Sequence, residues 1–259
     1  MDLGIKGRKA IICAASKGLG KACAMALSRE GVDVVIAARG AEALEATAKE
    51  IRNETGGKVT AVVADVTTRQ GRAALLNACK EPDILITNAG GPPHGDFREF
   101  DVDDWIKALN TNMIPAIEPI KATIDPMIAR KFGRIVNITS RAVKEPGSNL
   151  PLSNGARAGL TGFASSVARD VAEHNVIMNN LLPGSFETDR LRSGINEMVK
   201  KTGKSAEELR KWGVSRIPAR RIGDPEEFGA MCAYLCSVHV GYMVAQNIMM
   251  DGGEYPGLL

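Results

Sequence analysis

The chain has few aromatic residues and almost no excess charge, and these shortages exclude several classes of protein. Aromatic residues make up 4% of the sequence, and the formal net charge is only +3. Nucleic-acid binders need a clustered positive field, so we expect no nucleic-acid partner. No run reaches the roughly 18 apolar residues of a membrane span, and no apolar signal core follows residues 1–4. The 44% hydrophobic content instead fits a globular protein with a full core.

The cysteines are too few and too scattered for a disulfide framework. Their number is odd, which favours reduced thiols and a cytoplasmic location. Cys232 and Cys236 lie four residues apart on one face of a predicted helix, so a metal pair is an alternative. No further His or Cys cluster accompanies them, and we therefore expect core packing and no metal. The five are Cys13, Cys23, Cys79, Cys232 and Cys236.

Apolar strand-like runs alternate with amphipathic helix-like runs along most of the chain. Strands separated by helices form βαβ units, which predict a parallel sheet with helices on both faces. We therefore expect an α/β, Rossmann-type doubly wound sheet of about seven strands, in a single domain over residues 1–259. The predicted strands are Ala10–Ala14, Val32–Ala37, Val59–Val63, Ile84–Thr87, Gly133–Ile138, Val176–Leu182 and Ile248–Met250. The predicted helices cover residues 18–30, 41–54, 68–80, 102–129, 154–174 and 225–237.

One polar segment interrupts this alternation. Residues 187–221 are rich in charge and lie between the sixth predicted strand and the last predicted helix. They resemble a small helical excursion that can close over a pocket as a substrate lid. A solvated surface is the alternative interpretation.

A glycine turn after the first predicted strand is the clearest sign of a ligand. The turn contains Ser16, Lys17, Gly18, Leu19 and Gly20, and a helix-like run follows it. Glycines let the backbone approach a pyrophosphate, and the helix N-terminus offers free N–H groups and a positive dipole end. The turn therefore predicts a dinucleotide site.

Two cations near this turn indicate which dinucleotide is bound. Enzymes that prefer NAD usually end their second strand in an acid that binds the ribose 2′-hydroxyl, but here the strand ends at Arg39. Arg39 and Lys17 can both face a 2′-phosphate. They favour NADP(H) over NAD, unless both are ordinary surface cations.

Polar or glycine residues also follow the next two predicted strands. Asp65 and Val66 come after the third strand, where an Asp can bond the adenine amino group. Asn88, Ala89 and Gly90 come after the fourth. The carboxyl ends of parallel strands converge on the crevice in which open α/β sheets bind ligands. We therefore place all five residues in the coenzyme site.

Taken together, these motifs resemble the short-chain dehydrogenase/reductase family, with a layout close to the 3-oxoacyl-(acyl carrier protein) reductases. The resemblance implies a seven-stranded sheet, a homotetramer or dimer, and a small carbonyl or alcohol substrate. It also implies that Pro183, Gly184 and Thr188 contact the nicotinamide carboxamide and the phosphates. The family's Thr-Gly pair is Cys13-Ala14 here. The matching pieces are, in order, Cys13–Gly20, Asp65-Val66, Asn88–Gly90, Asn112, Gly133–Ser140, Pro183–Thr188 and Asp251–Gly253.

The catalytic set that the resemblance implies is Asn, Ser, Tyr and Lys, and only half of it is present. Asn112 and Ser140 match, as holder of a relay water and as orienter of the substrate carbonyl. The Tyr position, thirteen residues after Ser140, is Ser153, and the Lys position is Arg157. A serine hydroxyl is far less acidic than a phenol of pKa about 10, and it is shorter. Arg157 keeps the positive charge and can bond a ribose hydroxyl, but its shape differs from that of an ammonium group.

Three residues are candidates for supplying the proton that tyrosine would give. Ser153 can pass a proton through a water, His94 lies on the loop after the fourth strand, and Tyr255 lies in the C-terminal tail. Arg141 and Lys144, just after Ser140, can bind an anionic substrate or an oxyanion, or can be solvated.

Three functional hypotheses remain open from the sequence. The favoured one is an NADP(H)-dependent oxidoreductase that reduces a ketone or 3-oxoacyl-type carbonyl with an atypical proton-donor site. The alternative is an NADP-binding regulatory or partner subunit with little redox activity. The third, dehydration or hydrolysis at Ser153, lacks a Ser/His/Asp arrangement at readable spacing.

Overall fold

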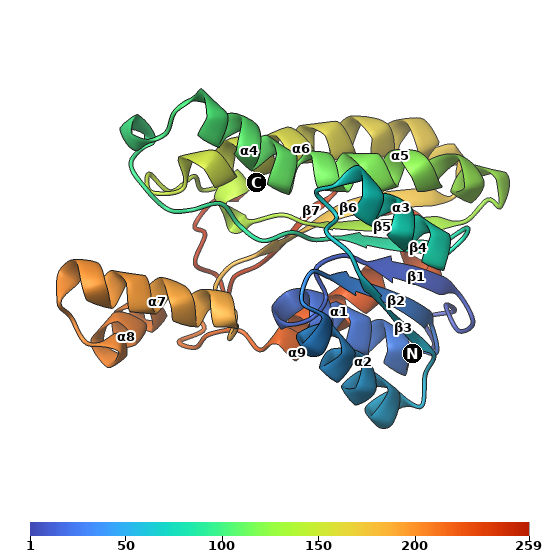
Figure 1. Ribbon diagram of the computed structural model, residues 1–259, viewed down its shortest axis with the longest axis horizontal. Coiled ribbons are helices and arrows are strands. Elements are labelled where there is room, and N and C mark those ends of the chain that lie inside the picture. The colour runs from blue at the N-terminus through green and yellow to red at the C-terminus, as the bar shows by residue number, and fades with distance from the viewer. Residues whose placement is uncertain (259) are drawn as a thin grey trace.

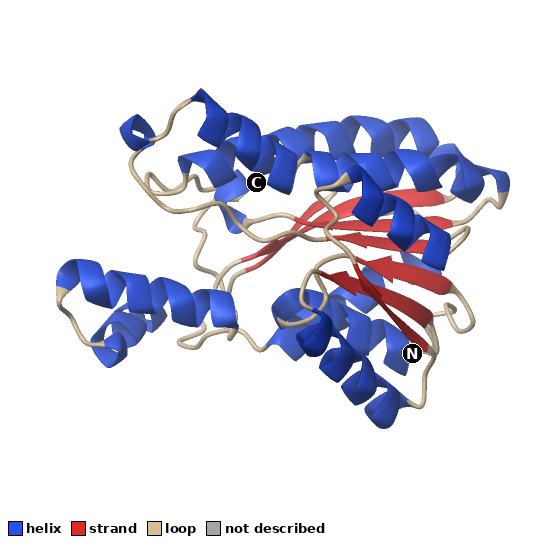
Figure 2. Ribbon diagram, in the orientation of Figure 1, coloured by secondary structure: helices blue, strands red, loops and turns tan. Residues whose placement is uncertain are grey.

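The computed structural model describes residues 1–258 and contains one seven-stranded parallel sheet (Figure 2). The strands follow the order β3-β2-β1-β4-β5-β6-β7. All seven predicted strands are confirmed, with bounds that shift by two residues at most. They are β1 Lys9–Ile12, β2 Asp33–Ala38, β3 Val59–Val63, β4 Ile84–Thr87, β5 Gly133–Ile138, β6 Val176–Pro183 and β7 Asn247–Met250.

Helices cover both faces of the sheet, as a doubly wound Rossmann fold requires (Figure 1). Successive strand side chains point to opposite faces, so Ala10 and Ile12 join one apolar cluster and Ile11 joins the other. The first face carries α1 Gly18–Arg29, α2 Ala41–Thr55 and α9 Pro225–Leu235. The second carries α3 Arg69–Ala78, α5 Ile114–Ala129 and α6 Pro151–Val171, with α4 Val102–Asn112 packed on α5 and α6.

The helix predicted over residues 102–129 is wrong in one respect, because the chain forms two helices there. The helix α4 ends at Asn112 and α5 begins at Ile114. Pro115 has no N–H to donate to the preceding turn, which weakens the helix at this point, whereas α5 continues through Pro119 and Pro126. The polar side chain next to the break is buried and hydrogen-bonded. Asn112 is 3% exposed, and its side-chain amide donates to the carbonyl oxygen of Ala108. The prediction missed the interruption that positions Asn112.

A chain of polar side chains crosses the four strands that lead to the site. Thr87 Oγ1 lies 2.7 Å from Asn137 Oδ1, and Asn137 Nδ2 donates to Asn180 Oδ1 at 3.0 Å. Asn180 Nδ2 donates in turn to Asn247 Oδ1 at 2.8 Å. These buried bonds satisfy groups that burial would otherwise penalise, and they fix β4, β5, β6 and β7 against one another.

The 187–221 segment contains two helices that project from the body of the fold (Figure 1). Neither α7 Asp189–Thr202 nor α8 Ala206–Arg216 has a buried residue. Ion pairs hold the two ends of this hairpin to the body. Asp189 meets Lys17 at 3.3 Å, and Arg216 meets Glu254 at 3.7 Å. Among residues 1–258, no helix is long and apolar enough to cross a membrane.

Candidate functional site

The glycine turn forms a tight cradle between β1 and α1. Ala14 has φ +49°, a left-handed conformation that the glycine expected at this position would adopt without strain. A Cβ on Gly20 would overlap the carbonyl oxygen of Ala14 and lie 2.9 Å from Asn88 Nδ2, so this position has room only for glycine. Asn88 Nδ2 donates to that same carbonyl at 3.2 Å. The turn after β1 and the loop after β4 are therefore joined by a hydrogen bond.

The loop after β6 faces the same cradle. Gly18 has φ +59°, and a Cβ there would lie 3.5 Å from Thr188 Cγ2. Pro183 and Gly184 end β6 and enter this loop, which places them on the Thr188 side of the cradle. The first turn of α1 contains no acidic residue, so its N-terminal N–H groups remain suited to an anion. The residues present fit a pyrophosphate at the N-terminus of α1, next to Gly18 and Thr188.

Lys17 is not the free cation that the sequence suggested. Its Nζ lies 3.3 Å from Asp189 Oδ2, and both side chains are largely exposed. The pair joins the coenzyme turn to the first residue of α7. An anionic ligand that uses Lys17 would compete with Asp189 for the ammonium group.

Arg39 and Asp65 lie together at the ends of β2 and β3. Two hydrogen bonds from Thr67 lower the pKa of Asp65, and the charge of Arg39 lowers it further. Arg39 itself is exposed and Val66 is buried. This group has a free guanidinium beside a fixed carboxylate, an arrangement that fits the adenosine end of a dinucleotide with a 2′-phosphate.

Arg157 is buried and ties three segments of the site together. It is 8% exposed, and its Nη1 donates to the carbonyl of Ile138 at 2.9 Å. Its Nη2 lies 3.3 Å from Asn112 Oδ1 and 3.5 Å from the carbonyl oxygen of Ala89. Burial lowers the pKa of Arg157 to about 10, with a smaller contribution from the nearby charge of Arg190. The group remains a cation at neutral pH, and it has no carboxylate partner in the described part of the chain.

A small recess adjoins Asn112 and Arg157. Its volume is about 10 Å³, and it also touches Thr87, Asn88 and Ala89. A space of this size holds about one water molecule. The relay position that the family resemblance assigns to Asn112 therefore has room for a single water.

Ser140 and Ser153 have different surroundings. The Ser140 hydroxyl accepts from the N–H of Ala142 at 3.1 Å and caps the short 3₁₀ turn Arg141–Val143. Ser153 lies in the first turn of α6, one helical turn before Arg157, and is 7% exposed. Its hydroxyl makes no hydrogen bond within residues 1–258. The site thus contains a serine without a partner where the resemblance expects a phenol.

The two other proton-donor candidates are placed differently. His94 Nε2 lies 3.1 Å from Arg190 Nη2, and a guanidinium can only donate, so Nε2 accepts. Burial and the charge of Arg190 lower the pKa of His94, which favours the neutral ring. His94 therefore presents no proton at Nε2. Tyr255 is partly buried in the tail, where its N–H donates to Asp251 Oδ2 at 2.8 Å.

The two cations after Ser140 also differ. Arg141 meets Glu145 at 2.7 Å and Glu254 at 3.3 Å, so carboxylates already compensate its charge. Glu254 is only 10% exposed in its side chain and also contacts Arg216 of α8. Lys144 has no carboxylate partner among the described residues. Of the pair, only Lys144 keeps a free charge.

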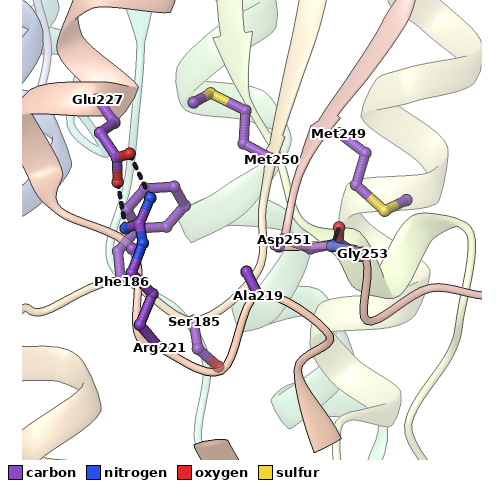
Figure 3. Close-up of a pocket in the computed structure, with 11 residues that line it drawn as sticks. Ser185, Phe186, Ala219, Arg221, Glu227, Met249, Met250, Asp251 and Gly253 are labelled. Carbon is purple, nitrogen blue, oxygen red and sulfur yellow. Dashed lines mark hydrogen bonds and ion pairs between the residues drawn. The ribbon is translucent and has the colours of Figure 1, made fainter.

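A larger hollow lies at the carboxyl end of β7 and contains none of the predicted site residues (Figure 3). Its volume is about 260 Å³. Its main charged groups are already paired, since Arg221 meets Glu227 at 2.5 Å. Asp251 in its wall accepts from the N–H of Gly253 at 2.9 Å. We assign it no role in the chemistry.

Three residues of the site escaped sequence reasoning: Asp189, Arg190 and Glu254. Asp189 and Arg190 lie in a segment rich in charge, where nothing in the pattern separates one charged residue from another, and Glu254 lies in the C-terminal tail, where the sequence gives no sign of its partners. Asp189 and Arg190 directly follow Thr188, and that proximity was the one available signal.

Comparisons with known proteins agree with this arrangement. The family model described as short chain dehydrogenase matches residues 8–198. The NADPH-dependent reductase BacG of Bacillus subtilis is 30% identical over 252 residues, covering 95% of this chain and 97% of that protein. The 3-oxoacyl-[acyl-carrier-protein] reductase FabG of Vibrio harveyi is 30% identical, covering 98% of this chain and 99% of that protein. The structure of L-sorbose reductase from Gluconobacter frateurii, complexed with NADPH and L-sorbose, superposes with a TM-score of 0.94 at 27% identity, covering all of both chains. The chain therefore belongs to the short-chain dehydrogenase family.

Proposed function

We propose that this protein is an NADP(H)-dependent reductase of a ketone or 3-oxoacyl-type carbonyl compound, with a proton-donor site that lacks tyrosine. The observation that carries the proposal is the buried Arg157 guanidinium, bonded to Asn112 and to the end of β5 beside Ser140. A site that had lost its chemistry would not need to keep a buried cation without a carboxylate, because such burial is unfavourable.

The coenzyme assignment rests on the two ends of the cradle. The turn of residues 16–20 with Thr188 would hold the pyrophosphate, and Lys17 and Arg39 would bind the 2′-phosphate. The loop residues Asn88–Gly90 and Pro183-Gly184 would border the nicotinamide. The absence of an acid at the end of β2 and the NADPH named for relatives both support NADP(H).

Bound NADPH supplies a hydride to the carbonyl carbon, and one proton must reach the carbonyl oxygen to complete the alcohol. Ser140 would orient that oxygen by donating its hydroxyl hydrogen, since the hydroxyl already accepts from Ala142. Arg157 would stabilise the negative charge that develops on the oxygen, because its own charge is uncompensated and shielded from water. It would also bond a ribose hydroxyl of the coenzyme.

The proton itself would come from water held at Ser153. A serine hydroxyl is too weak an acid to donate directly, but it can hydrogen-bond a water in the volume that a phenol would fill. Ser153 is free to do so, because its hydroxyl has no partner within residues 1–258. The one-water space at Asn112 would connect to this path from the opposite side of Arg157.

The remaining features fit a cytoplasmic homotetramer or dimer built from a single domain. Val102, Ile106 and Leu109 leave an apolar stripe exposed on α4, by 72%, 50% and 39%. The strand β7 leaves an unpaired edge at one end of the sheet. Two such surfaces would support two subunit contacts. The 187–221 segment would act as a substrate lid, since its helices have no buried face of their own.

The test is NADPH oxidation by the native protein across a panel of ketones, 3-oxo esters and aldehydes, compared with two variants. We expect the native protein to be active, and Ser153→Ala to lose part of that activity. The double variant Ser153→Tyr/Arg157→Lys restores a phenol and an ammonium group, and general acid catalysis of this kind contributes roughly 10²- to 10⁴-fold. A silent native protein beside an active double variant would favour the alternative, a coenzyme-binding partner subunit.

A further inference from the structure

The first turn of α7 carries an arginine that reaches across to the loop after β4. Arg190 Nη2 donates to the carbonyl of Pro92 at 3.1 Å and to His94 Nε2 at 3.1 Å. A Cβ on Gly91 would lie 3.0 Å from the same nitrogen, so the loop approaches the guanidinium closely. The strand β5 lies between β4 and β6 in the sheet, so the loop after β4 and the start of α7 flank the carboxyl end of β5, where Ser140 follows.

The charge of Arg190 is not compensated by a carboxylate. The 187–221 segment contains six arginines: Arg190, Arg192, Arg210, Arg216, Arg220 and Arg221. Four of them form ion pairs, with Glu187, Asp189, Glu227 or Glu254. Arg220 bonds the backbone of its own segment at Ser215. Among the described residues, Arg190 is the arginine of this segment that contacts the loop after β4, and it forms no ion pair.

Several nearby groups add to this positive field, and one acid, Glu197, opposes it through its charge on His94. The charge of Arg190 acts on the buried Arg157, which has no carboxylate partner in the described chain. His94 is favoured as a neutral ring that accepts from Arg190 and carries no negative charge. The nearest acid in sequence, Asp189, is already held by Lys17 and Arg192. An anion that enters between Arg190 and Arg157 would therefore meet two cations, neither of which forms an ion pair with a carboxylate of the described residues.

We propose that the substrate is an oxo acid and that Arg190 binds its carboxylate. This inference rests on the proposed carbonyl reduction and names the substrate class of the same site. A guanidinium matches a carboxylate with two parallel N–H···O bonds, and both partners are charged. Arg190 would exchange its bonds to Pro92 and His94 for the carboxylate, while the carbonyl lies over Ser140. The contact would also close the start of α7 over the bound substrate.

The test compares 3-oxobutanoate with its methyl ester, which has the same reacting carbonyl and no charge. The variant is Arg190→Gln, and the matched control is Arg192→Gln, two residues along α7, where Glu187 and Asp189 occupy the guanidinium. Loss of a charge-assisted pair predicts that Arg190→Gln raises KM for the acid roughly 10- to 100-fold. In Arg190→Gln we expect KM for the ester to change less than about twofold. In Arg192→Gln, KM for both the acid and the ester should also change less than about twofold.

Binding measurements separate this inference from the proposed function. The Kd of NADPH should stay within about twofold in Arg190→Gln, and the native protein saturated with NADP⁺ should bind 3-oxobutanoate more tightly than the ester. A weakened NADPH Kd would assign Arg190 to the coenzyme pyrophosphate and overturn the inference. Parallel losses for acid and ester, or a native protein that prefers the ester in both binding and turnover, would also overturn it. Failure to bind NADPH at all would instead refute the proposed function.

Discussion

Replacing Asp189 with asparagine should tighten the binding of NADPH. In the structure Asp189 holds the Lys17 ammonium at 3.3 Å, and a 2′-phosphate must displace it to use that charge. The two side chains are 50% and 69% exposed, so the pair contributes about 0.2–1 kcal/mol. Removing the competition should therefore lower the Kd of NADPH by about 1.4- to 5-fold, since about 1.4 kcal/mol corresponds to tenfold.

Nucleotide titrations at low ionic strength test whether Asp189→Asn lowers the Kd of NADPH. NADH has no 2′-phosphate, so its Kd should not change in Asp189→Asn, whereas 2′,5′-ADP should follow NADPH. The control is Glu187→Gln, which releases Arg192 and Arg210 but leaves Lys17 paired. The decrease in the Kd of NADPH should be smaller at about 0.5 M salt, where exposed charges are screened. The reasoning is refuted if NADH gains as much as NADPH, or if Glu187→Gln reproduces the effect.

Three further substitutions test other contacts of the site. Glu254→Gln should lower the free energy of unfolding by about 1–2 kcal/mol, because its nearly buried carboxylate joins two arginines, whereas Glu145→Gln should cost less than about 0.5 kcal/mol. Urea denaturation measures the free energy of unfolding of both variants. Equal losses would show that the contact of Glu254 with two arginines adds no stability. The lowered pKa of His94 means that the unfolded chain binds the proton more readily, so stability should fall as the pH drops below about 6.5. His94→Gln should reduce the fall in the free energy of unfolding between pH 7.5 and 5.5. An unchanged pH dependence would show that His94 is not its cause. Arg157→Met should change the free energy of unfolding by less than about 1 kcal/mol, because the buried acceptors lose their donor but the cost of burying an unpaired cation is removed, and a loss of about 3 kcal/mol would show that Arg157 is kept for the fold rather than for the chemistry.

The sequence was sufficient for the sheet and for the cradle. Apolar runs between helix-like runs defined all seven strands, and the turn at Gly18 and Gly20 marked where strand and helix meet. The sequence was insufficient where a charged side chain has several possible ion-pair partners. Lys17 reads as a free cation in the sequence, but only the fold shows that Asp189, far along the chain, reaches it. The break at Met113 was missed because its apolar neighbours continue a helical pattern across the proline.

Sequence reasoning was limited in the same way for the side chains of the candidate catalytic site. Counting from Ser140 identified Ser153 and Arg157, but not that Arg157 would turn inward to backbone carbonyls. Arg190 was indistinguishable from five other arginines in its segment until their ion pairs were known. Local pattern predicts elements, whereas the pairing of exposed charges depends on contacts that no local pattern encodes.

The central claim is that a site without tyrosine still reduces a carbonyl with NADPH. The most direct measurement follows deuterium from NADPH deuterated at the transferring position of its nicotinamide into the product of the native protein. The account predicts one deuterium on the carbinol carbon for each coenzyme oxidised, with the hydroxyl proton drawn from water. Tight NADPH binding without deuterium in any product of the carbonyl panel would contradict it, and would leave a coenzyme-binding protein in place of a reductase.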